Sequence, residues 1–196
     1  KFLMVSTPEV YVRTYDESSE KHNYFPSTPY AASKAAGDLH LITLFKRYNF
    51  PVVFTRTTNV HGLNQQLYRI IPRTILSTRT GKELELHGGG LSSRSFIHIS
   101  DVVKATLQLS LEASPGSTWH LSTNEIISIK DLVKKICRIT SVEFESIVKT
   151  TEERMGKDKS YFLDSSSIRT EFNWSEKISL DEGLKQTLSW IDNNIE

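Results

Sequence analysis

The sequence predicts an α/β fold built on a parallel sheet. Two short apolar runs, at residues 2–5 and 51–56, are typical of strands that are covered on both faces. Between them, residues 30–48 contain four alanines in a pattern that favours a helix. A strand, a helix and a strand in this order form a βαβ unit, in which the two strands run parallel.

The composition indicates a chain that buries a core and has no overall positive field. Of the 196 residues, 38% are hydrophobic, which is too many for a disordered chain. The 24 basic and 23 acidic residues leave a formal charge of +1, which does not favour nucleic acid as a partner. No apolar run reaches the roughly 18 residues of a membrane span. No signal peptide is recognisable, so we expect a cytoplasmic protein without a membrane partner.

Neither disulfide nor metal chemistry is expected. The single Cys137 excludes an internal disulfide, and its apolar helical surroundings indicate a core thiol rather than a nucleophile. The six histidines show no metal-ligand spacing, and no second cysteine is present to complete a zinc site.

The middle of the chain is expected to contain a long polar loop, followed by a short helix and two strands. Residues 12–29 are polar and read as a long surface loop, a class of loop that is often functional. Residues 70–78 predict a short helix, and residues 83–87 alternate as a half-buried strand does. The glycines at 88–90 precede another alternating strand at 95–99 and predict a hairpin turn, because no helix follows them as in a dinucleotide loop.

The last third predicts alternating helices and strands. The expected elements are a helix at 101–111, a strand at 119–121, a helix at 128–139, a strand at 143–148 and a helix from residue 179. Asp101 is placed as the N-cap of the first of these helices. Ser128 and Asp131 resemble a capping box for the second, and Ser179 and Glu182 form one for the last.

The pair Tyr30 and Lys34 is the strongest chemical candidate in the sequence. Residues four apart share one face of a helix. A lysine ammonium beside a phenol lowers the pKa of the phenol, which otherwise lies near 10 and is too high for a base at neutral pH. Most pairs with this spacing are solvated helix surface, and here the position at a helix start after a long polar loop favours function.

Several short motifs occur in an order that resembles a known family. They are Ser6-Thr7-x-Glu9-Val10-Tyr11, Pro29-Tyr30-x-x-Ser33-Lys34, Arg56-x-x-Asn59-x-His61-Gly62, Ile71-Pro72, Gly88-x-Gly90 with Arg94-x-Phe96 and Asp101-Val102, and Arg154-x-Gly156-x-Asp158 with Tyr161. The ordered set resembles the extended short-chain dehydrogenases/reductases, and within them the NDP-sugar 4,6-dehydratases that act on dTDP-glucose. The resemblance implies a lyase with NAD as cofactor and a nucleotide sugar as substrate.

The resemblance also implies catalytic roles. Tyr30 would deprotonate the C4 hydroxyl of the sugar, and Lys34 would hold the nicotinamide ribose and lower the pKa of Tyr30. Thr7 would hydrogen-bond to the C4 oxygen. Glu9 would remove the C5 proton that a C4 ketone makes acidic. An ordinary loop carboxylate is the alternative for Glu9.

Five residues match positions that contact the nucleotide diphosphate or the nucleotide: Asn59, Arg69, Arg94, Asn124 and Arg154. Arginine suits this task because its planar guanidinium forms two bonds to phosphate oxygens. Surface or ion-pair roles are the alternative for Arg94 and Arg154, and a turn cap is the alternative for Asn59.

Two departures from the family pattern stand out. Pro8 occupies the position of an aspartate that protonates the departing C6 hydroxyl, and proline cannot donate a proton. The Gly-x-x-Gly-x-x-Gly turn that seats the pyrophosphate of NAD does not occur in the sequence. We therefore expect these 196 residues alone to be inactive.

The resemblance predicts two parts. Residues 1–62 would complete the C-terminal part of a Rossmann-type parallel sheet. Residues 63–196 would form mainly a smaller α+β lobe that binds the nucleotide sugar, with a possible return to the sheet near 97–123. A homodimer is expected by resemblance, with the helices at 30–48 and 101–111 as candidate contacts. A UDP-glucuronate decarboxylase, an NDP-sugar epimerase and a truncated binding module without activity are the alternative functions.

Overall fold

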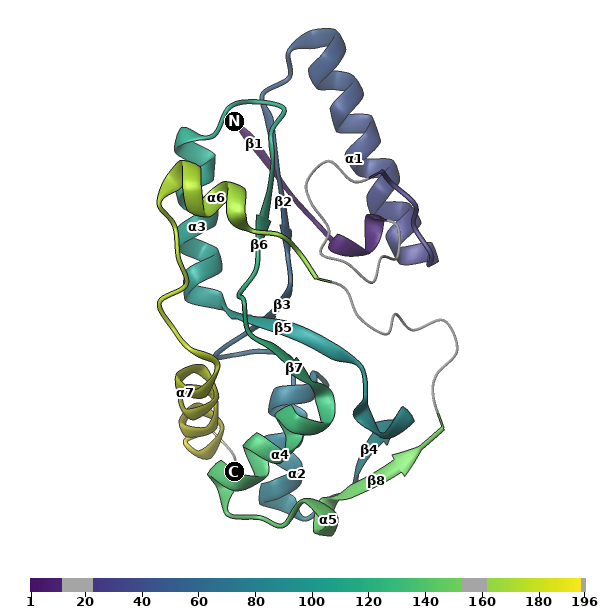
Figure 1. Ribbon diagram of the computed structural model, residues 1–196, viewed down its shortest axis with the longest axis vertical. Helices are drawn as coiled ribbons and strands as arrows, with labels where there is room; N and C mark the ends of the chain where they lie inside the picture. Colours follow the sequence, from purple (N-terminus) through teal and green to yellow (C-terminus); the bar gives the residue numbers. More distant parts are fainter. Residues whose placement is uncertain (12–22, 153–161, 195–196) are drawn as a thin grey trace.

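The computed structural model describes residues 1–11, 23–152 and 162–194. It contains a three-stranded parallel sheet (Figure 1). The strands of this sheet are β1 (Phe2–Ser6), β2 (Val52–Thr57) and β6 (Thr118–Leu121), in the order β1-β2-β6. Helix α1 (Pro29–Tyr48) connects β1 to β2, which pair in parallel, so the predicted βαβ unit is confirmed. The chain returns to this sheet at β6, which pairs in parallel with β2.

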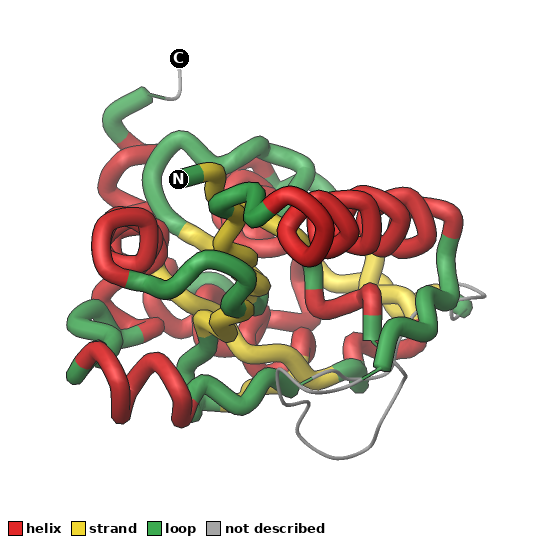
Figure 2. The backbone as a smooth tube through the Cα atoms, turned by 90° about the horizontal axis from the view of Figure 1, so that it is seen from above, coloured by secondary structure: helices red, strands yellow, loops and turns green. Residues whose placement is uncertain are grey.

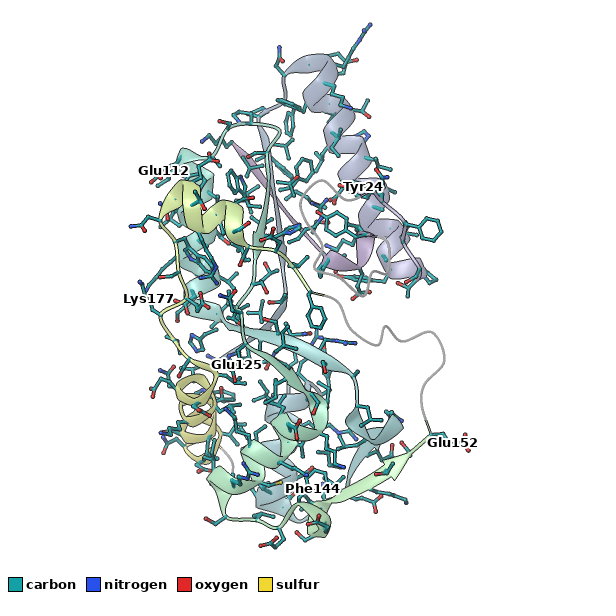
Figure 3. All side chains as sticks on the ribbon, viewed as in Figure 1. Tyr24, Glu112, Glu125, Phe144, Glu152 and Lys177 are labelled. Atoms are coloured by element: carbon teal, nitrogen blue, oxygen red, sulfur yellow. The ribbon has the colours of Figure 1, made fainter. Side chains whose placement is uncertain are left out.

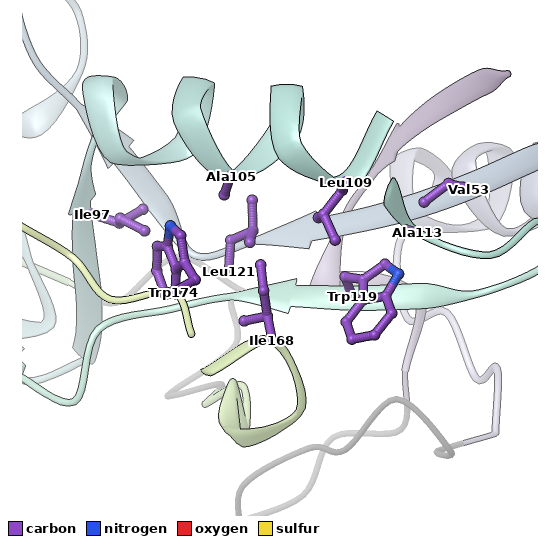
Figure 4. Close-up of a cluster of buried hydrophobic side chains, with 9 residues drawn as sticks. All are labelled: Val53, Ile97, Ala105, Leu109, Ala113, Trp119, Leu121, Ile168 and Trp174. Carbon is purple, nitrogen blue, oxygen red and sulfur yellow. The ribbon is translucent and has the colours of Figure 1, made fainter. Parts of the chain in front are cut away.

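Different helices cover the two faces of this sheet. On one face, Asp38 of α1 hydrogen-bonds to Ser6 of β1 and Arg56 of β2. On the other face, α3 (Ile99–Glu112) packs over β2 in a cluster of buried side chains (Figure 4). The cluster consists of Val53, Ile97, Ala105, Leu109, Ala113, Trp119, Leu121, Ile168 and Trp174. Because neighbouring residues of a strand point to opposite faces, α1 and α3 lie on opposite sides of the sheet.

The two predicted buried strands differ in exposure. Residues 52–56 of β2 are all buried, as expected. In β1, Phe2 and Val5 are 45% and 56% exposed, so the prediction of a strand covered on both faces is wrong there. β1 lies at the edge of the described sheet, whereas β2 is its central strand and has a neighbour on each side.

Two smaller sheets follow. The first joins β3 (Asn59–His61), β5 (Ser93–His98) and β7 (Ile126–Ser128) in the order β3-β5-β7. The second pairs β4 (Leu84–His87) in parallel with β8 (Val148–Thr151). Seen from above, the strands lie between helices on both sides (Figure 2). The division of the chain near residue 62 stays a prediction.

The hairpin that the three glycines predict is wrong. Gly88–Gly90 form a short 3-10 turn between β4 and β5, but these two strands belong to different sheets and do not pair with each other. All three glycines have positive φ angles, between 58° and 71°. A Cβ on Gly90 would lie 3.0 Å from the backbone nitrogen of Lys130, so the turn also packs tightly on the start of the next helix.

The remaining helices surround a second cluster of buried side chains, which consists of Ile71, Ile75, Phe96, Leu132, Ile136, Leu180, Leu184 and Ile191. These helices are α2 (Ile70–Thr80), α4 (Ile129–Thr140) and α7 (Leu180–Asp192), with short helices η1 (Pro8–Val10), α5 (Phe144–Ile147) and α6 (Ser166–Phe172) elsewhere. Ser128 and Ser179 accept hydrogen bonds from backbone N–H groups three residues later, as both predicted caps require. Cys137 is buried in α4 and has no disulfide partner.

Two predicted boundaries are wrong. Helix α3 begins before Asp101, because the Nδ1 of His98 accepts the N–H of Ser100 and acts as the cap. Asp101 instead accepts the N–H of Ile178 and ties α3 to the chain before α7. The strand expected at 143–148 is the single turn α5, followed by β8, which begins only at residue 148. No helix among the described residues has the length and apolar character that crossing a membrane requires.

Candidate active site

The carboxyl end of β1 carries the first two predicted catalytic residues. Thr7 follows the strand directly and is only 7% exposed. Its side-chain oxygen caps η1 by accepting the N–H of Glu9 at 3.4 Å. Glu9 lies in the first turn of η1 and is half-buried. The short helix therefore presents a hydroxyl and a carboxylate from one turn of chain.

The start of α1 carries the other two predicted catalytic residues, Tyr30 and Lys34. Thr28 caps this helix by accepting the N–H of Ala31 at 3.1 Å. Tyr30 is 54% exposed, so its phenol is accessible at the helix start. One turn later, the Nζ of Lys34 donates to the carbonyl oxygen of Val5 at 3.3 Å. This bond holds the ammonium at the carboxyl end of β1, and α1 also packs on η1. The four predicted catalytic residues thus come from two elements that meet at one strand end.

A cavity of about 260 Å³ lies at the end of β6. Its wall consists of Ser95, Ser122, Thr123, Asn124, Ile126, Phe162 and Leu163. Hydroxyl groups dominate the polar part of this wall. Ser95 Oγ donates to the carbonyl oxygen of Thr123 at 3.0 Å, and Ser122 Oγ donates to Ser95 Oγ at 3.3 Å.

Of the five predicted substrate contacts, one lines the cavity and two lie on neighbouring parts of the chain. Asn124 is exposed and lines the cavity. The side-chain amide of Asn59 donates to the carbonyl oxygen of Ser95 at 3.3 Å, directly behind the cavity wall. Arg94 precedes Ser95 on β5 and is 7% exposed, with Nη1 donating to the carbonyl oxygen of Ser93 at 2.7 Å. The cavity therefore brings the amide of Asn124 together with several hydroxyls, while Arg94 belongs to the same strand as Ser95 but is not part of the wall.

The other two predicted contacts are placed differently. Arg69 is exposed at the N-cap of α2, with its guanidinium 5.5 Å from the ring centroid of Tyr68. It does not belong to the cavity wall. Arg154 lies outside the described residues. The role of both in substrate binding stays a prediction.

Leu163 connects the cavity to the segments that carry the predicted catalytic residues. It lines the cavity and also packs with Val10, Tyr11 and Ala35, which belong to η1, its C-cap and α1. The hollow and the strand end that carries Glu9 are therefore neighbours. The serines and threonine of the cavity wall are not among the predicted site residues, although the polar run 122–124 directly after a strand is the kind of signal that marks a strand-end site.

The site shows no metal-binding constellation. Within the described ranges, no group of three or more histidine, cysteine, aspartate or glutamate residues could hold a metal ion. The chemistry available is that of a phenol, an ammonium, a hydroxyl and a carboxylate. This set can transfer protons to and from a hydroxyl group and from a carbon acid.

Known proteins resemble the chain over nearly its whole length. The model of a family described as GDP-mannose 4,6 dehydratase matches residues 1–187. A dTDP-D-glucose 4,6-dehydratase of Mus musculus is 35% identical over 99% of the chain and 56% of its own length. A dTDP-glucose 4,6-dehydratase of Haemophilus influenzae is 30% identical over 97% of the chain and 60% of its own length.

Solved structures of similar proteins also match nearly the whole chain. The dTDP-glucose 4,6-dehydratase of Streptomyces venezuelae, crystallised with NAD, superposes with a TM-score of 0.93 at 27% identity, over 98% of the chain and 60% of the solved one. A UDP-glucuronic acid 4-epimerase of Bacillus cereus superposes with a TM-score of 0.91 at 24% identity, over 98% and 61%, which shows the shared fold. The chain spans about 56–61% of the length of these relatives.

Proposed function

Because the chain belongs to the GDP-mannose 4,6 dehydratase family, we propose that it carries the catalytic and substrate-binding residues of an NDP-hexose 4,6-dehydratase. The reaction would convert a dTDP-glucose-like substrate to its 4-keto-6-deoxy product with loss of water. One observation supports this proposal: η1, which carries Glu9 and is capped by Thr7, packs against α1, which carries Tyr30 and Lys34, and Lys34 bonds to the carboxyl end of β1. Open α/β sheets bind their ligands at such strand ends.

The residues present could bind the nicotinamide ribose of NAD. The ammonium of Lys34, held at the carbonyl oxygen of Val5 beside the half-exposed Tyr30, offers a donor and a phenol to the nicotinamide ribose. NAD, when bound, supplies the hydride acceptor and donor for oxidation at C4 and reduction at C6. The pyrophosphate has no matching glycine-rich turn in the 196 residues. The chain alone would therefore hold the cofactor weakly.

The proposed proton transfers follow from the side chains. Tyr30 takes the proton of the C4 hydroxyl, while Thr7 donates a hydrogen bond to the same oxygen. Glu9 removes the C5 proton, which is acidic next to a ketone. Pro8 is the first residue of η1 and cannot protonate the departing C6 hydroxyl, so Glu9 would return its proton there. C5 would regain a proton from solvent when the hydride adds to C6.

The cavity at the end of β6 is proposed as part of the nucleotide-sugar site. Its volume of about 260 Å³ is below the range of pockets that enclose a whole drug-sized ligand, about 300–1,000 Å³, so it suits one moiety of the substrate. Hydroxyls and the amide of Asn124 would bind sugar or ribose hydroxyls, and the side chain of Asn59 bonds to the backbone of Ser95 in the same wall. We keep Arg69, Arg94 and Arg154 as proposed diphosphate contacts.

The test is turnover with product analysis by mass. Purified chain, alone and joined to the segment of the mouse relative that it does not span, would be incubated with NAD and dTDP-glucose, UDP-glucose, GDP-mannose or UDP-glucuronate. If the joined protein converts the nucleotide sugar to a product lighter by one water, the proposal is supported. We expect no turnover by the chain alone. Loss of CO2 from UDP-glucuronate supports the decarboxylase, and an unchanged mass with inverted C4 supports the epimerase. No reaction by the joined protein supports a binding module.

Two substitutions sharpen this test. Glu9→Gln removes the proposed C5 base, so dehydration should fall at least about a hundredfold, in line with the usual contribution of a general base. Glu112→Gln is the matched control, because Glu112 is exposed at the end of α3 and its side chain accepts only from Gln108 in the described bonds. Equal turnover by both variants would contradict the role of Glu9.

We also propose a homodimer that forms through α1. Ala32, Ala36 and Leu39 are exposed at helical spacing on this helix, and small residues allow a second helix to approach closely. Helix α3 carries a separate exposed stripe on the opposite face, so the two helices cannot form one twofold contact. Sedimentation should show a dimer that Leu39→Glu dissociates and Leu107→Glu does not.

We place the protein in the cytoplasm, where thiols stay reduced. Its one cysteine is buried and unpaired, so the fold needs no oxidising compartment. Neither nucleic acid nor a membrane is proposed as a partner.

A further inference from the structure

A guanidinium and a carboxylate are buried together under the proposed catalytic residues. Arg56 of β2 and Asp38 of α1 form an ion pair with 2.8 Å between Nη2 and Oδ2, and their side chains are 2% and 0% exposed. Removing two charges from water is costly and is repaid only when hydrogen bonds satisfy the remaining polar atoms. Here Asp38 Oδ1 and Arg56 Nε have no hydrogen-bond partner in the described part of the chain. Stability alone is therefore a weak explanation for this pair.

The carboxylate holds the end of β1. Asp38 Oδ2 accepts the hydroxyl of Ser6 at 2.6 Å and the hydroxyl of Tyr24 at 3.1 Å. Ser6 is the residue directly before Thr7. A single carboxylate oxygen on α1 thus fixes β1 at the point where the segment that carries Thr7 and Glu9 begins.

The guanidinium holds the other end of that segment. Arg56 Nη1 donates to the hydroxyl of Tyr11 at 2.9 Å, and Nη2 donates to the hydroxyl of Tyr24. The guanidinium also lies over both rings, 4.7 Å from the centroid of Tyr11 and 5.3 Å from that of Tyr24. The tyrosine hydroxyl at position 11 is further bonded to Nε2 of His120 at 2.8 Å.

The two tyrosines are themselves tied together. Tyr11 and Tyr24 form an antiparallel backbone bridge, and Figure 3 shows Tyr24 beside α1. Burial raises the pKa of Tyr24, so its hydroxyl keeps its proton and can donate to Asp38 while it accepts from Arg56. We call Ser6, Tyr11, Tyr24, Asp38, Arg56 and His120 the Arg56 cluster.

We propose that the Arg56 cluster positions the segment that carries Thr7 and Glu9 against the helix that carries Tyr30 and Lys34. The segment is held at Ser6 and at Tyr11, and both predicted catalytic residues lie between these points. Asp38 lies one turn beyond Lys34 on the same helix. The cluster members act through other residues, so they are positioning residues, and the catalytic part of this inference rests on the proposed function.

The first test measures local amide exchange in the full chain. Tyr11→Phe removes one hydroxyl and keeps the ring under the guanidinium. We expect exchange at the amides of Val10 and Tyr11, which donate to the carbonyls of Thr7 and Pro8, to accelerate about tenfold, the effect of losing one hydrogen bond. The amides of β2 should not change. Tyr48→Phe is the matched control, because Tyr48 is 72% exposed at the far end of α1.

Two results would overturn the proposal. Unchanged exchange at Val10 and Tyr11 would show that the cluster does not hold the segment. Equal acceleration at β2 would show a general loss of stability. Arg56→Lys provides a second variant, because a single ammonium cannot reach Tyr11, Tyr24 and Asp38 together. This variant should accelerate exchange at the same two amides. Exchange as slow as in the unsubstituted chain would also contradict the proposal.

The kinetic test separates this inference from the proposed function. In the joined protein, Tyr11→Phe should lower kcat for dTDP-glucose at least about tenfold while KM stays within about twofold, because the loss concerns geometry at the reacting atoms. A fall in kcat/KM through KM alone would contradict it. If the unsubstituted protein shows no turnover, the proposed function fails, and the exchange measurement still decides whether the cluster holds the segment.

Discussion

Two buried histidines should make the stability of this fold depend on pH. His61 of β3 and His98 of β5 are 2% and 3% exposed, and their ring centroids are 5.4 Å apart, edge to face. Neither ring nitrogen of His61 has a hydrogen-bond partner among the described residues. Burial, and then repulsion from His98, lowers the pKa of His61 to about 4, although Asp101 opposes this shift. Burial also lowers the pKa of His98.

The direction of the effect follows from proton binding. As the pH falls below about 6.5, the unfolded chain protonates its histidines, whereas folded His61 stays neutral down to about pH 4. The unfolded state then binds more protons, so the free energy of unfolding falls with the pH. The difference between 6.5 and about 4, at about 1.4 kcal/mol per pH unit, corresponds to about 3 kcal/mol for His61. The contribution is complete above pH 6.5 and is lost towards pH 4.

Urea unfolding followed by tryptophan fluorescence, at several pH values from 8 to about 4.5, measures this loss. His61→Gln should reduce the slope of the free energy of unfolding against pH by an amount that corresponds to about one proton. A buried amide also lowers stability at every pH. His40→Gln is the matched control, since His40 is exposed on α1, and it should leave the slope unchanged. An equal slope for His61→Gln and the unsubstituted chain would refute the assignment.

Three further predictions concern packing and the surface. Gly116→Ala should lower the free energy of unfolding by about 1–3 kcal/mol in urea titrations, because Gly116 has φ 83° and a Cβ would lie 2.2 Å from Phe45 Cε1; unchanged stability would contradict this clash. Cys137 should react with a thiol reagent much faster in urea than in buffer, because burial hides the thiol and raises its pKa; equal rates would place it at the surface. Arg79→Ala should change the free energy of unfolding by less than about 1 kcal/mol, because the ion pair with Asp192 is solvent-exposed; a larger loss in thermal unfolding would show a structural role.

Local patterns in the sequence predicted the elements around the catalytic group. The apolar runs, the alanine-rich helix and the serine caps depend on neighbours within a few residues, so they can be read directly. The spacing of Tyr30 and Lys34 is of the same kind. The cavity wall was harder to predict, because Ser95, Ser122 and Phe162 come from three separate segments.

The sequence by itself determined the βαβ unit, the family and the order of the catalytic motifs. Only the tertiary structure decided which helix covers which face of the sheet, and with it that α1 and α3 lie on opposite sides. It also decided that the glycines at 88–90 join strands of different sheets, because β4 pairs with a strand 64 residues later. The partners of Arg56 lie 18 to 45 residues away, and no local pattern encodes which buried hydroxyl or carboxylate a guanidinium will meet.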